Sequence, residues 1–152
     1  MSTAAAVDIL EKPALGAVER LLANAGLPTT DLTSAHLETF FGVGSPEALD
    51  AVVGVELHGD SALLRSLVVA PLTRSRGLGR ALVSAAERCA RSAGASDVYL
   101  LTSTAEPFFE SLGYARTDRS SAPQAIRRTY EFASLCPASA TFMHKRLVPT
   151  GT

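Results

Sequence analysis

The chain has 152 residues, of which 47% are hydrophobic and 19% are charged, and its formal net charge is −1. This composition excludes a disordered chain, and the charge gives no chain-wide footprint for a nucleic acid. The length predicts a single domain over residues 1–152, with an ordered core over about 6–148. No apolar run approaches the ~18 residues of a membrane span, and the N-terminus lacks the basic start of a signal peptide. We therefore expect a cytoplasmic protein with no membrane or nucleic-acid partner.

Hydrophobic periodicity and turn residues predict a mixture of strands and helices. The expected strands are 7–10, 38–43, 51–58, 61–69, 98–101, 114–118 and 140–147, with 128–132 resuming the sixth after a polar excursion at 119–126. The expected helices are 13–26, 78–93 and 104–112, with one or two helical turns within 31–37. This order predicts an α+β fold in which an antiparallel meander is followed by strand–helix–strand pieces.

A glycine-rich turn between strand 61–69 and helix 78–93 carries the clearest functional signal. It consists of Arg74, Ser75, Arg76, Gly77, Leu78, Gly79 and Arg80. Glycines let successive backbone N–H groups point inward, and the N-terminus of a helix adds a partial positive charge. Three arginines favour a multiply charged anion such as a pyrophosphate. The alternative is a turn that only reverses the chain.

The spacing of this turn argues against two common phosphate loops. Leu82 stands where a dinucleotide-binding fingerprint has its third glycine, and no lysine lies nearby for a P-loop. The turn instead resembles the acetyl-CoA signature Gln/Arg-x-x-Gly-x-Gly/Ala of the GCN5-related N-acetyltransferase (GNAT) superfamily. The element order resembles that family over nearly the whole chain. The resemblance implies acetyl-CoA as cosubstrate and a small-molecule amine as acceptor.

The same resemblance implies a fold and a cofactor position. The fold would be a mixed central sheet of about six or seven strands, flanked by helices, in which two parallel central strands splay apart. Those strands would be 61–69 and 98–101, and the cofactor would enter the wedge between them. The pyrophosphate would lie on the backbone of 74–80, and the pantetheine arm on the backbone of Leu67, Val68 and Val69. A homodimer through the C-terminal strands is also implied.

A second motif from Thr102 to Tyr114 resembles the family pattern Asn-x-x-Ala-x-x-Phe-Tyr-x-x-x-Gly-Phe, with two departures. Thr102 stands where an asparagine often binds the pantetheine arm. Phe109 follows Phe108 where many members carry the tyrosine that protonates the leaving thiolate. A phenyl ring has no such proton, so another group does this work or the thiolate leaves unassisted. Core packing is the alternative role of both phenylalanines.

The candidate base for the acceptor amine is Glu56, late in strand 51–58. If Gly59 and Asp60 form a two-residue turn, Glu56 faces the same side of the sheet as Arg65. We therefore name Glu56 and Arg65 as candidate catalytic residues. The alternative is a Glu56–Arg65 ion pair with a structural role. His58, beside the turn, is expected to be solvated.

The acceptor is predicted from a second resemblance, carried by the tail from Ala122 to Lys145. Together with the segments near Leu27 and Leu100, this tail resembles the arsenic-resistance branch of these acetyltransferases. Members of that branch are associated with N-acetylation of arsinothricin, a glutamate-like amino acid that carries a methylarsinate, and phosphinothricin acetyltransferases are related in function. Such an acceptor favours arginine donors. The candidate acceptor-binding residues are Arg65, Arg119, Arg127 and Cys136, and Arg128 is a further arginine of this group.

Two other functions remain open from the sequence. One keeps the fold and replaces the acceptor by a different small amine. The other is a non-catalytic CoA-binding or arsenic-responsive module, which the missing tyrosine supports. Cys89 and Cys136 give neither a disulfide framework nor a metal-ligand spacing, so no metal is expected.

Overall fold

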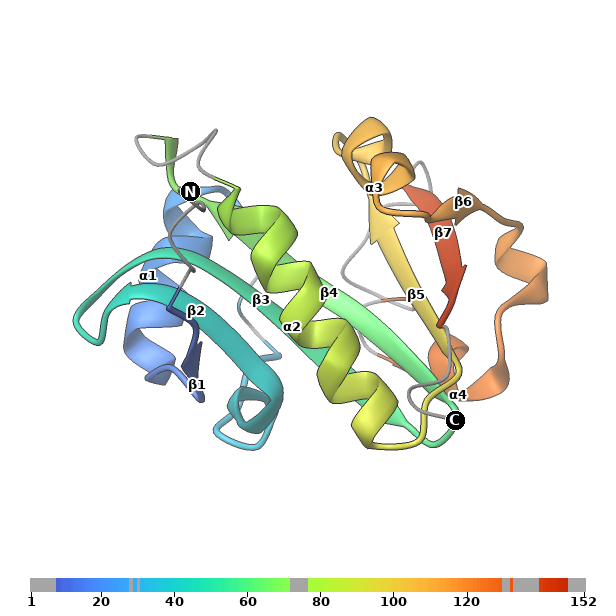
Figure 1. Cartoon of the computed structure of the whole chain (residues 1–152), viewed down its shortest axis with the longest axis horizontal. Helices are drawn as coiled ribbons and strands as arrows, with labels where there is room; N and C mark the ends of the chain where they lie inside the picture. The colour runs from blue at the N-terminus through green and yellow to red at the C-terminus, as the bar shows by residue number, and fades with distance from the viewer. Residues whose placement is uncertain are drawn as a thin grey trace, which may run out of the picture. The chain divides into compact units, whose positions relative to one another are not determined.

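The computed structural model describes residues 8–27, 29, 31–71, 77–129, 132 and 140–147 of the chain (Figure 1). The predictions for Arg74, Ser75, Arg76 and Cys136 therefore concern residues outside the described part of the chain. The chain divides into two compact units, each of which combines two segments. The first unit is Met1–Gly54 with Ser66–Ala86, and the second is Val55–Arg65 with Glu87–Thr152.

The first unit packs a helix onto an antiparallel part of the sheet. Its elements are β1 (Leu10–Glu11), α1 (Leu15–Asn24), the 3-10 helix η1 (His36–Thr39), β2 (Phe40–Ser45), most of β3 (Ala48–His58), the end of β4 (Ser61–Val69) and the start of α2 (Leu78–Ser92). β2 pairs antiparallel with β1 and with β3. Val18 and Leu22 of α1 are fully buried and share one core with Phe40 and Val52. The 3.6-residue apolar stripe of α1 thus covers this part of the sheet.

One glycine in this unit is required by a close approach. Gly54 pairs with Phe40 across β2 and β3, and a Cβ added to Gly54 would lie 2.2 Å from the Phe40 ring. The ring occupies the space that any side chain at position 54 would need. This contact explains why a glycine stands among the valines of β3, Val52, Val53 and Val55.

The described part of the second unit carries the remaining strands, the end of α2 and short helices. Its further elements are β5 (Asp97–Thr102), α3 (Glu106–Ser111), β6 (Ala115–Arg116), η3 (Arg119–Ser121), α4 (Gln124–Arg127) and β7 (Thr141–Arg146). β7 pairs antiparallel with β5 and with β6. Ile126 of α4 is buried in one cluster with Leu63 of β4 and Phe142 of β7. α4 therefore contributes to a hydrophobic core of the second unit.

The strands form one seven-stranded sheet in the order β1-β2-β3-β4-β5-β7-β6. β4 and β5 are parallel, and their ladder joins Ser61–Leu63 to Asp97–Tyr99. The predicted mixed sheet with two parallel central strands is confirmed, and the α+β class with it. None of the helices in the described part of the chain combines the length and the apolar character that a membrane crossing needs.

Two local predictions are wrong. The polar excursion at 119–126 contains η3 and α4, because Pro123 starts a turn of helix whose apolar residue, Ile126, becomes buried. The predicted strand at 128–132 is absent from its described residues: Arg128 and Thr129 form the turn after α4, and Phe132 lies outside any strand. Sequence periodicity over so few residues does not separate a helical turn from a strand.

Candidate functional site

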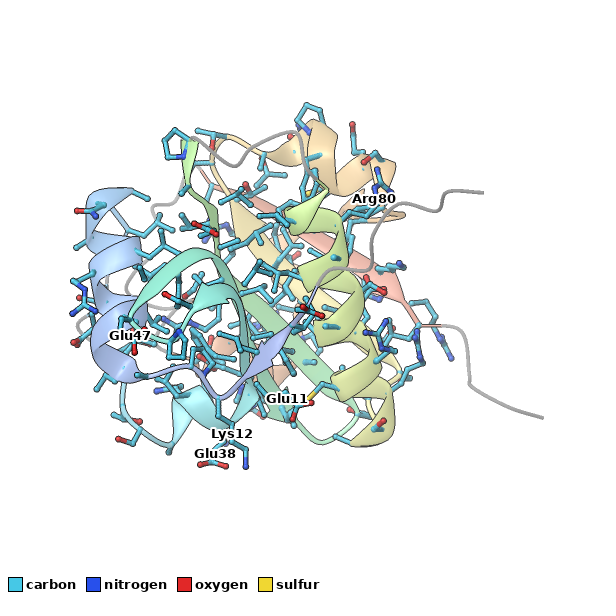
Figure 2. The ribbon with its side chains drawn as sticks, turned by 60° about the vertical axis from the view of Figure 1, so that its left-hand side comes forward. Glu11, Lys12, Glu38, Glu47 and Arg80 are labelled. Atoms are coloured by element: carbon cyan, nitrogen blue, oxygen red, sulfur yellow. The ribbon has the colours of Figure 1, made fainter. Side chains whose placement is uncertain are left out.

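The described part of the glycine-rich turn leads directly into α2. Gly77 has a φ of 75°, which favours glycine, and its carbonyl accepts the N–H of Ala81 at 3.1 Å. The first turn of α2 contains no acidic residue. Arg80 is exposed in this turn (Figure 2), and it makes no hydrogen bond or ion pair with the described residues. These features leave first-turn N–H groups and one cation for an anionic ligand.

The end of β4, in the same unit, is irregular before the turn. Ser66 has a φ of 60°, an uncommon value for a residue with a side chain. Val68 is buried in the core beside α1, whereas Leu67 and Val69 are half-buried. The N–H of Ala70 donates to the Asp50 carbonyl at 2.7 Å, which fixes the strand end. The three residues predicted to hold the pantetheine arm therefore follow a backbone distortion.

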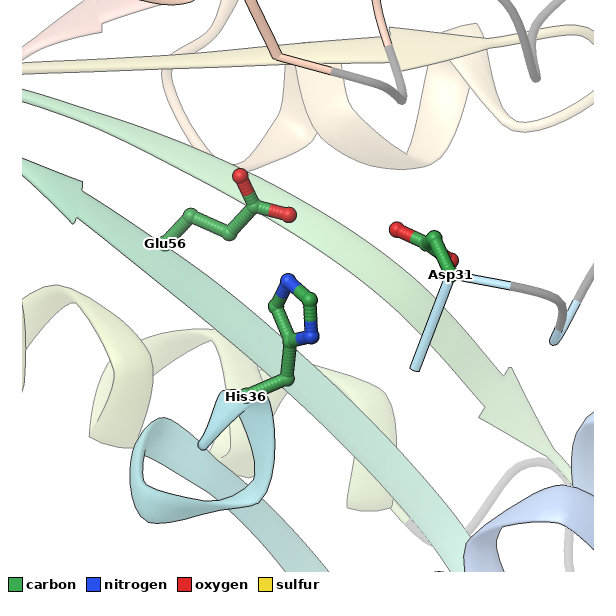
Figure 3. A group of neighbouring side chains, drawn as sticks. All are labelled: Asp31, His36 and Glu56. Atoms are coloured by element: carbon green, nitrogen blue, oxygen red, sulfur yellow. The ribbon is translucent and has the colours of Figure 1, made fainter. Parts of the chain in front are cut away.

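The second unit contains the predicted carboxylate–arginine pair. Gly59 and Asp60 form the two-residue turn between β3 and β4, and Glu56 projects from β3 (Figure 3). Arg65 Nη1 donates to Glu56 Oε2 at 2.7 Å, and the Arg65 side chain has no exposed surface. The pair that the sequence predicts is thus formed, and it is nearly free of competing water.

His58 was expected to be solvated, and it is half-buried, with a contact to Glu56 that was not predicted. His58 Nε2 lies 3.1 Å from Glu56 Oε1, and 29% of its side chain is exposed. Residues 56 and 58 face the same side of β3, since side chains alternate along a strand. That spacing was the signal in the sequence for this contact. Both carboxylate oxygens of Glu56 therefore have a partner.

Thr102 ends β5, and its hydroxyl caps the turn into α3. Thr102 Oγ1 accepts the N–H of Ala105 at 3.0 Å. Across the ladder, the Thr141 hydroxyl donates to Glu106 Oε1 at 3.3 Å. Arg116 donates to both oxygens of Glu106 at 2.9 Å. Side-chain bonds thus tie the end of β5 and the first turn of α3 to β6 and β7.

Phe109 lies in the core of this unit. It is 5% exposed and packs edge-on against Phe108 and Tyr114, with ring centroids 5.1 and 5.7 Å away. This packing matches the alternative role that the sequence left open for Phe109. Phe108 is only half-buried.

Sequence reasoning missed the hydrogen-bond network around Glu87, whose partners are distant in the chain. The Tyr114 hydroxyl donates to Glu87 Oε2 at 2.9 Å, and Lys145 Nζ donates to Glu87 Oε1 at 3.0 Å. Burial, the charge of Glu87 and this hydrogen bond raise the pKa of Tyr114 far above its usual range. The Tyr114 hydroxyl therefore stays protonated and is engaged by Glu87.

Two of the predicted acceptor-binding arginines donate hydrogen bonds to backbone carbonyls of this chain. Arg119 Nη2 donates to the Ala140 carbonyl at 2.9 Å, and its guanidinium lies 5.6 Å from the Phe132 ring centre. Arg127 donates to the carbonyls of Ala122 and Ser120. Arg128 is exposed and makes no hydrogen bond or ion pair with the described residues.

Comparison with known proteins identifies a family for most of the sheet and the glycine-rich turn. The family described as "Acetyltransferase (GNAT) domain" matches residues 39–116, slightly more than half of the chain. A comparison with curated protein sequences gave no match.

Similar solved structures include three that contain coenzyme A. N-acetylglutamate synthase from Neisseria gonorrhoeae, with coenzyme A and N-acetyl-glutamate, has a TM-score of 0.79 and 18% identity over 97% of this chain and 36% of its own. Rv2747 from Mycobacterium tuberculosis has a TM-score of 0.75 and 17% identity, over 93% of this chain and 99% of its own. PaiA N-acetyltransferase from Thermoplasma acidophilum has a TM-score of 0.64 and 15% identity, over 93% and 99%.

At these identities the similarity shows the fold alone. This chain spans about a third of the length of the Neisseria synthase. The family match covers the strands β2 to β5, the glycine-rich turn, α2 and α3. The predicted superfamily is thereby confirmed: the chain belongs to the GNAT acetyltransferase family.

Proposed function

We propose that this protein transfers the acetyl group of acetyl-CoA to the amine of a small molecule. The observation that carries this proposal is the start of α2, where Gly77, an exposed Arg80 and a first turn without acidic residues favour a bound anion. A pyrophosphate has the charge to use such a site. Three similar structures, each under 25% identical, are complexes with coenzyme A.

The residues of the chain fit the cofactor in two places. Gly77, Leu78, Gly79 and Arg80 would hold its pyrophosphate, together with Arg74, Ser75 and Arg76, which lie outside the described residues. Leu67, Val68 and Val69 would hold the pantetheine arm through their backbone, and Thr102 and Phe108 stay predicted cofactor-binding residues. Phe109, which is buried, would act as the wall behind Phe108. When bound, acetyl-CoA supplies an acetyl group activated as a thioester.

Glu56 is the proposed base, and Arg65 is the residue that positions it. An ammonium must lose its proton before its nitrogen can attack the thioester carbonyl. The carboxylate of Glu56 is held by Arg65 on one oxygen and by His58 on the other. The alternative is that these contacts make Glu56 a structural ion-pair partner and that water alone takes the proton.

We propose a glutamate-like acceptor that carries a second oxyanion, such as arsinothricin or phosphinothricin. Support comes from the tail resemblance and from the Neisseria enzyme, whose structure holds N-acetyl-glutamate. Arg128 is exposed and has no ion-pair partner among the described residues, so it is the arginine best able to meet such an oxyanion. Arg119 and Arg127 would shape the surrounding segment through their backbone contacts. Cys136 stays a predicted acceptor-side residue.

Release of the CoA thiol from acetyl-CoA tests both parts of the proposal. The purified protein is given arsinothricin, phosphinothricin, glutamate or spermine as acceptor. Release with the oxyanion amino acids but not with spermine is expected. Release with spermine alone would overturn the acceptor class and keep the reaction.

A non-catalytic CoA-binding module is the second candidate, because Phe109 is buried and has no proton to give. Acetyl-CoA binding without release for any acceptor would favour it. The single domain over 1–152, the homodimer and the cytoplasmic location stay predictions; sedimentation of the purified chain tests the dimer.

A further inference from the structure

Three polar side chains of the hairpin formed by β3 and β4 connect the interior of the second unit to its surface. The Arg65 side chain has no exposed surface, whereas 13% of the Glu56 side chain and 29% of the His58 side chain are exposed. Arg65 Nη1 donates to Glu56 Oε2 at 2.7 Å, and His58 Nε2 lies 3.1 Å from Glu56 Oε1. The same unit contains the arginines proposed to meet the acceptor.

The contact with Glu56 decides which nitrogen of the His58 ring carries the hydrogen. The Glu56 carboxylate is held by the Arg65 cation and acts only as an acceptor, so the hydrogen between the two groups lies on Nε2. In a neutral imidazole the other nitrogen then has a lone pair. This nitrogen, Nδ1, makes no hydrogen bond with the described residues.

An imidazole held in this way is oriented to take a proton. The carboxylate fixes the tautomer and the direction of the ring, and its negative charge stabilises the imidazolium that forms. Both oxygens of Glu56 already accept a hydrogen bond, whereas Nδ1 of His58 accepts none from the described residues. The ring therefore has the vacant lone pair of this pair of side chains, and its partial exposure admits water.

We propose that Nδ1 of His58 takes the proton of the acceptor ammonium, with Glu56 as the charged partner of the ring. This inference rests on the proposed function and deepens it: Glu56 supplies the negative charge of the base, and His58 supplies the lone pair. One N–H bond of the ammonium breaks, and its electron pair stays on the nitrogen for the attack. The proton forms an N–H bond at Nδ1, directly or through one water. The imidazolium then gives this proton to solvent, and the ring is neutral again.

His58→Gln separates proton transfer from positioning. The glutamine amide can still donate to Glu56, but it has no nitrogen that accepts a proton. Acetyl transfer is measured with acetyl-CoA and whichever of arsinothricin, phosphinothricin, glutamate and spermine the wild type acetylates. We expect His58→Gln and His58→Ala each to lower kcat by about 100-fold or more, with the KM of the acceptor changed by less than about 3-fold. Free imidazole should restore part of the rate of His58→Ala.

The matched control is His144→Gln. The His144 ring is also held by a carboxylate, since its Nε2 lies 2.7 Å from Asp97 Oδ1, and 32% of its side chain is exposed. Its partner is Asp97 on β5, rather than Glu56 in the hairpin. The same chemical change at His144 should leave the transfer rate unchanged. An equal loss in His144→Gln and His58→Gln would overturn the inference.

Nitrogen NMR of the protein without ligands gives a readout that does not depend on catalysis. The neutral His58 ring should carry its hydrogen on Nε2, and a hydrogen on Nδ1 would overturn the inference. A wild-type rate in His58→Gln would also overturn it, because His58 would then only position Glu56, and the proposed function would stand. If the wild type acetylates none of the four acceptors, the proposed function and the inference both fail.

Discussion

Arg65 and Arg80 are both predicted site residues, but Arg65 is buried and paired whereas Arg80 is exposed. The Arg65 side chain has no exposed surface and donates to Glu56 at 2.7 Å. Arg80 is exposed in the first turn of α2, without a hydrogen bond or ion pair to the described residues. A buried charge is very costly unless it is paired, so the contact between Arg65 and Glu56 contributes to the stability of the folded chain. An exposed, unpaired cation beside a glycine turn contributes little to folding and is available to a ligand.

The largest expected effect is on stability, from Arg65→Met. The change leaves the Glu56 carboxylate, 13% exposed, without its arginine, and a broken buried pair costs about 3–5 kcal/mol of unfolding free energy. Urea unfolding measures this loss. The double variant with Glu56→Gln should recover part of it, and Arg80→Met should change stability by less than about 0.5 kcal/mol. Equal losses from Arg65→Met and Arg80→Met would remove the distinction between the two sites.

Gly79→Glu should abolish acetyl-CoA binding without harming the fold. A carboxylate in the first turn of α2 repels a pyrophosphate, but it interacts favourably with the helix N-terminus, by about 0.3–1 kcal/mol. We expect at least about a 100-fold loss of affinity in calorimetry, with stability unchanged or slightly raised. Unchanged affinity would contradict the assignment of the cofactor to this turn.

Tyr114→Phe tests the buried network of the second unit. The variant removes the hydroxyl that donates to Glu87 and keeps the ring packed against Phe109. Loss of a hydrogen bond to a charged group costs about 1.5–3 kcal/mol, which thermal or urea unfolding would detect. Acetyl-CoA affinity should stay near the wild-type value. A selective loss of catalysis, with stability intact, would show that Tyr114 does more than support the fold.

Arg80→Ala gives a smaller effect on binding. Removal of one exposed cation should weaken acetyl-CoA binding by about 3- to 10-fold and reduce its dependence on salt, since exposed charges are screened. Calorimetry at two ionic strengths measures both. An identical salt dependence in the two proteins would place the bound phosphates away from Arg80.

The smallest effect concerns pH and Asp97. Burial alone would raise the pKa of Asp97, but hydrogen bonds from His144 and Ser96, with the charges of His144 and Arg146, outweigh it and lower the pKa below its ordinary 3.8. A carboxyl with a lowered folded pKa adds stability above its unfolded pKa and loses it as the pH falls through the folded pKa. Asp97→Asn should therefore lose less stability than the wild type on acidification below about pH 4. Parallel pH profiles of the two proteins would refute this.

Much of the fold could be predicted from local pattern. The strand Ser61–Val69 has the predicted bounds, and α2 ends within one residue of the prediction, because its apolar spacing is long and Gly94 follows. The segment 119–132 was not predictable: its four-residue helix forms because Ile126 packs against Leu63 and Phe142, which are distant in the sequence. Short elements take their structure from such contacts.

For the candidate site, the glycine-rich turn and the Glu56–Arg65 pair could be predicted from the sequence alone. Both depend on residues close together in the chain, on a strand-to-helix junction or across a two-residue hairpin. The partners of the other buried charged side chain, Glu87, depend on the tertiary structure. Glu87 is bonded to Tyr114, 27 residues away, and to Lys145, 58 residues away. Local spacing carries no information about such partners, because long-range packing brings them together.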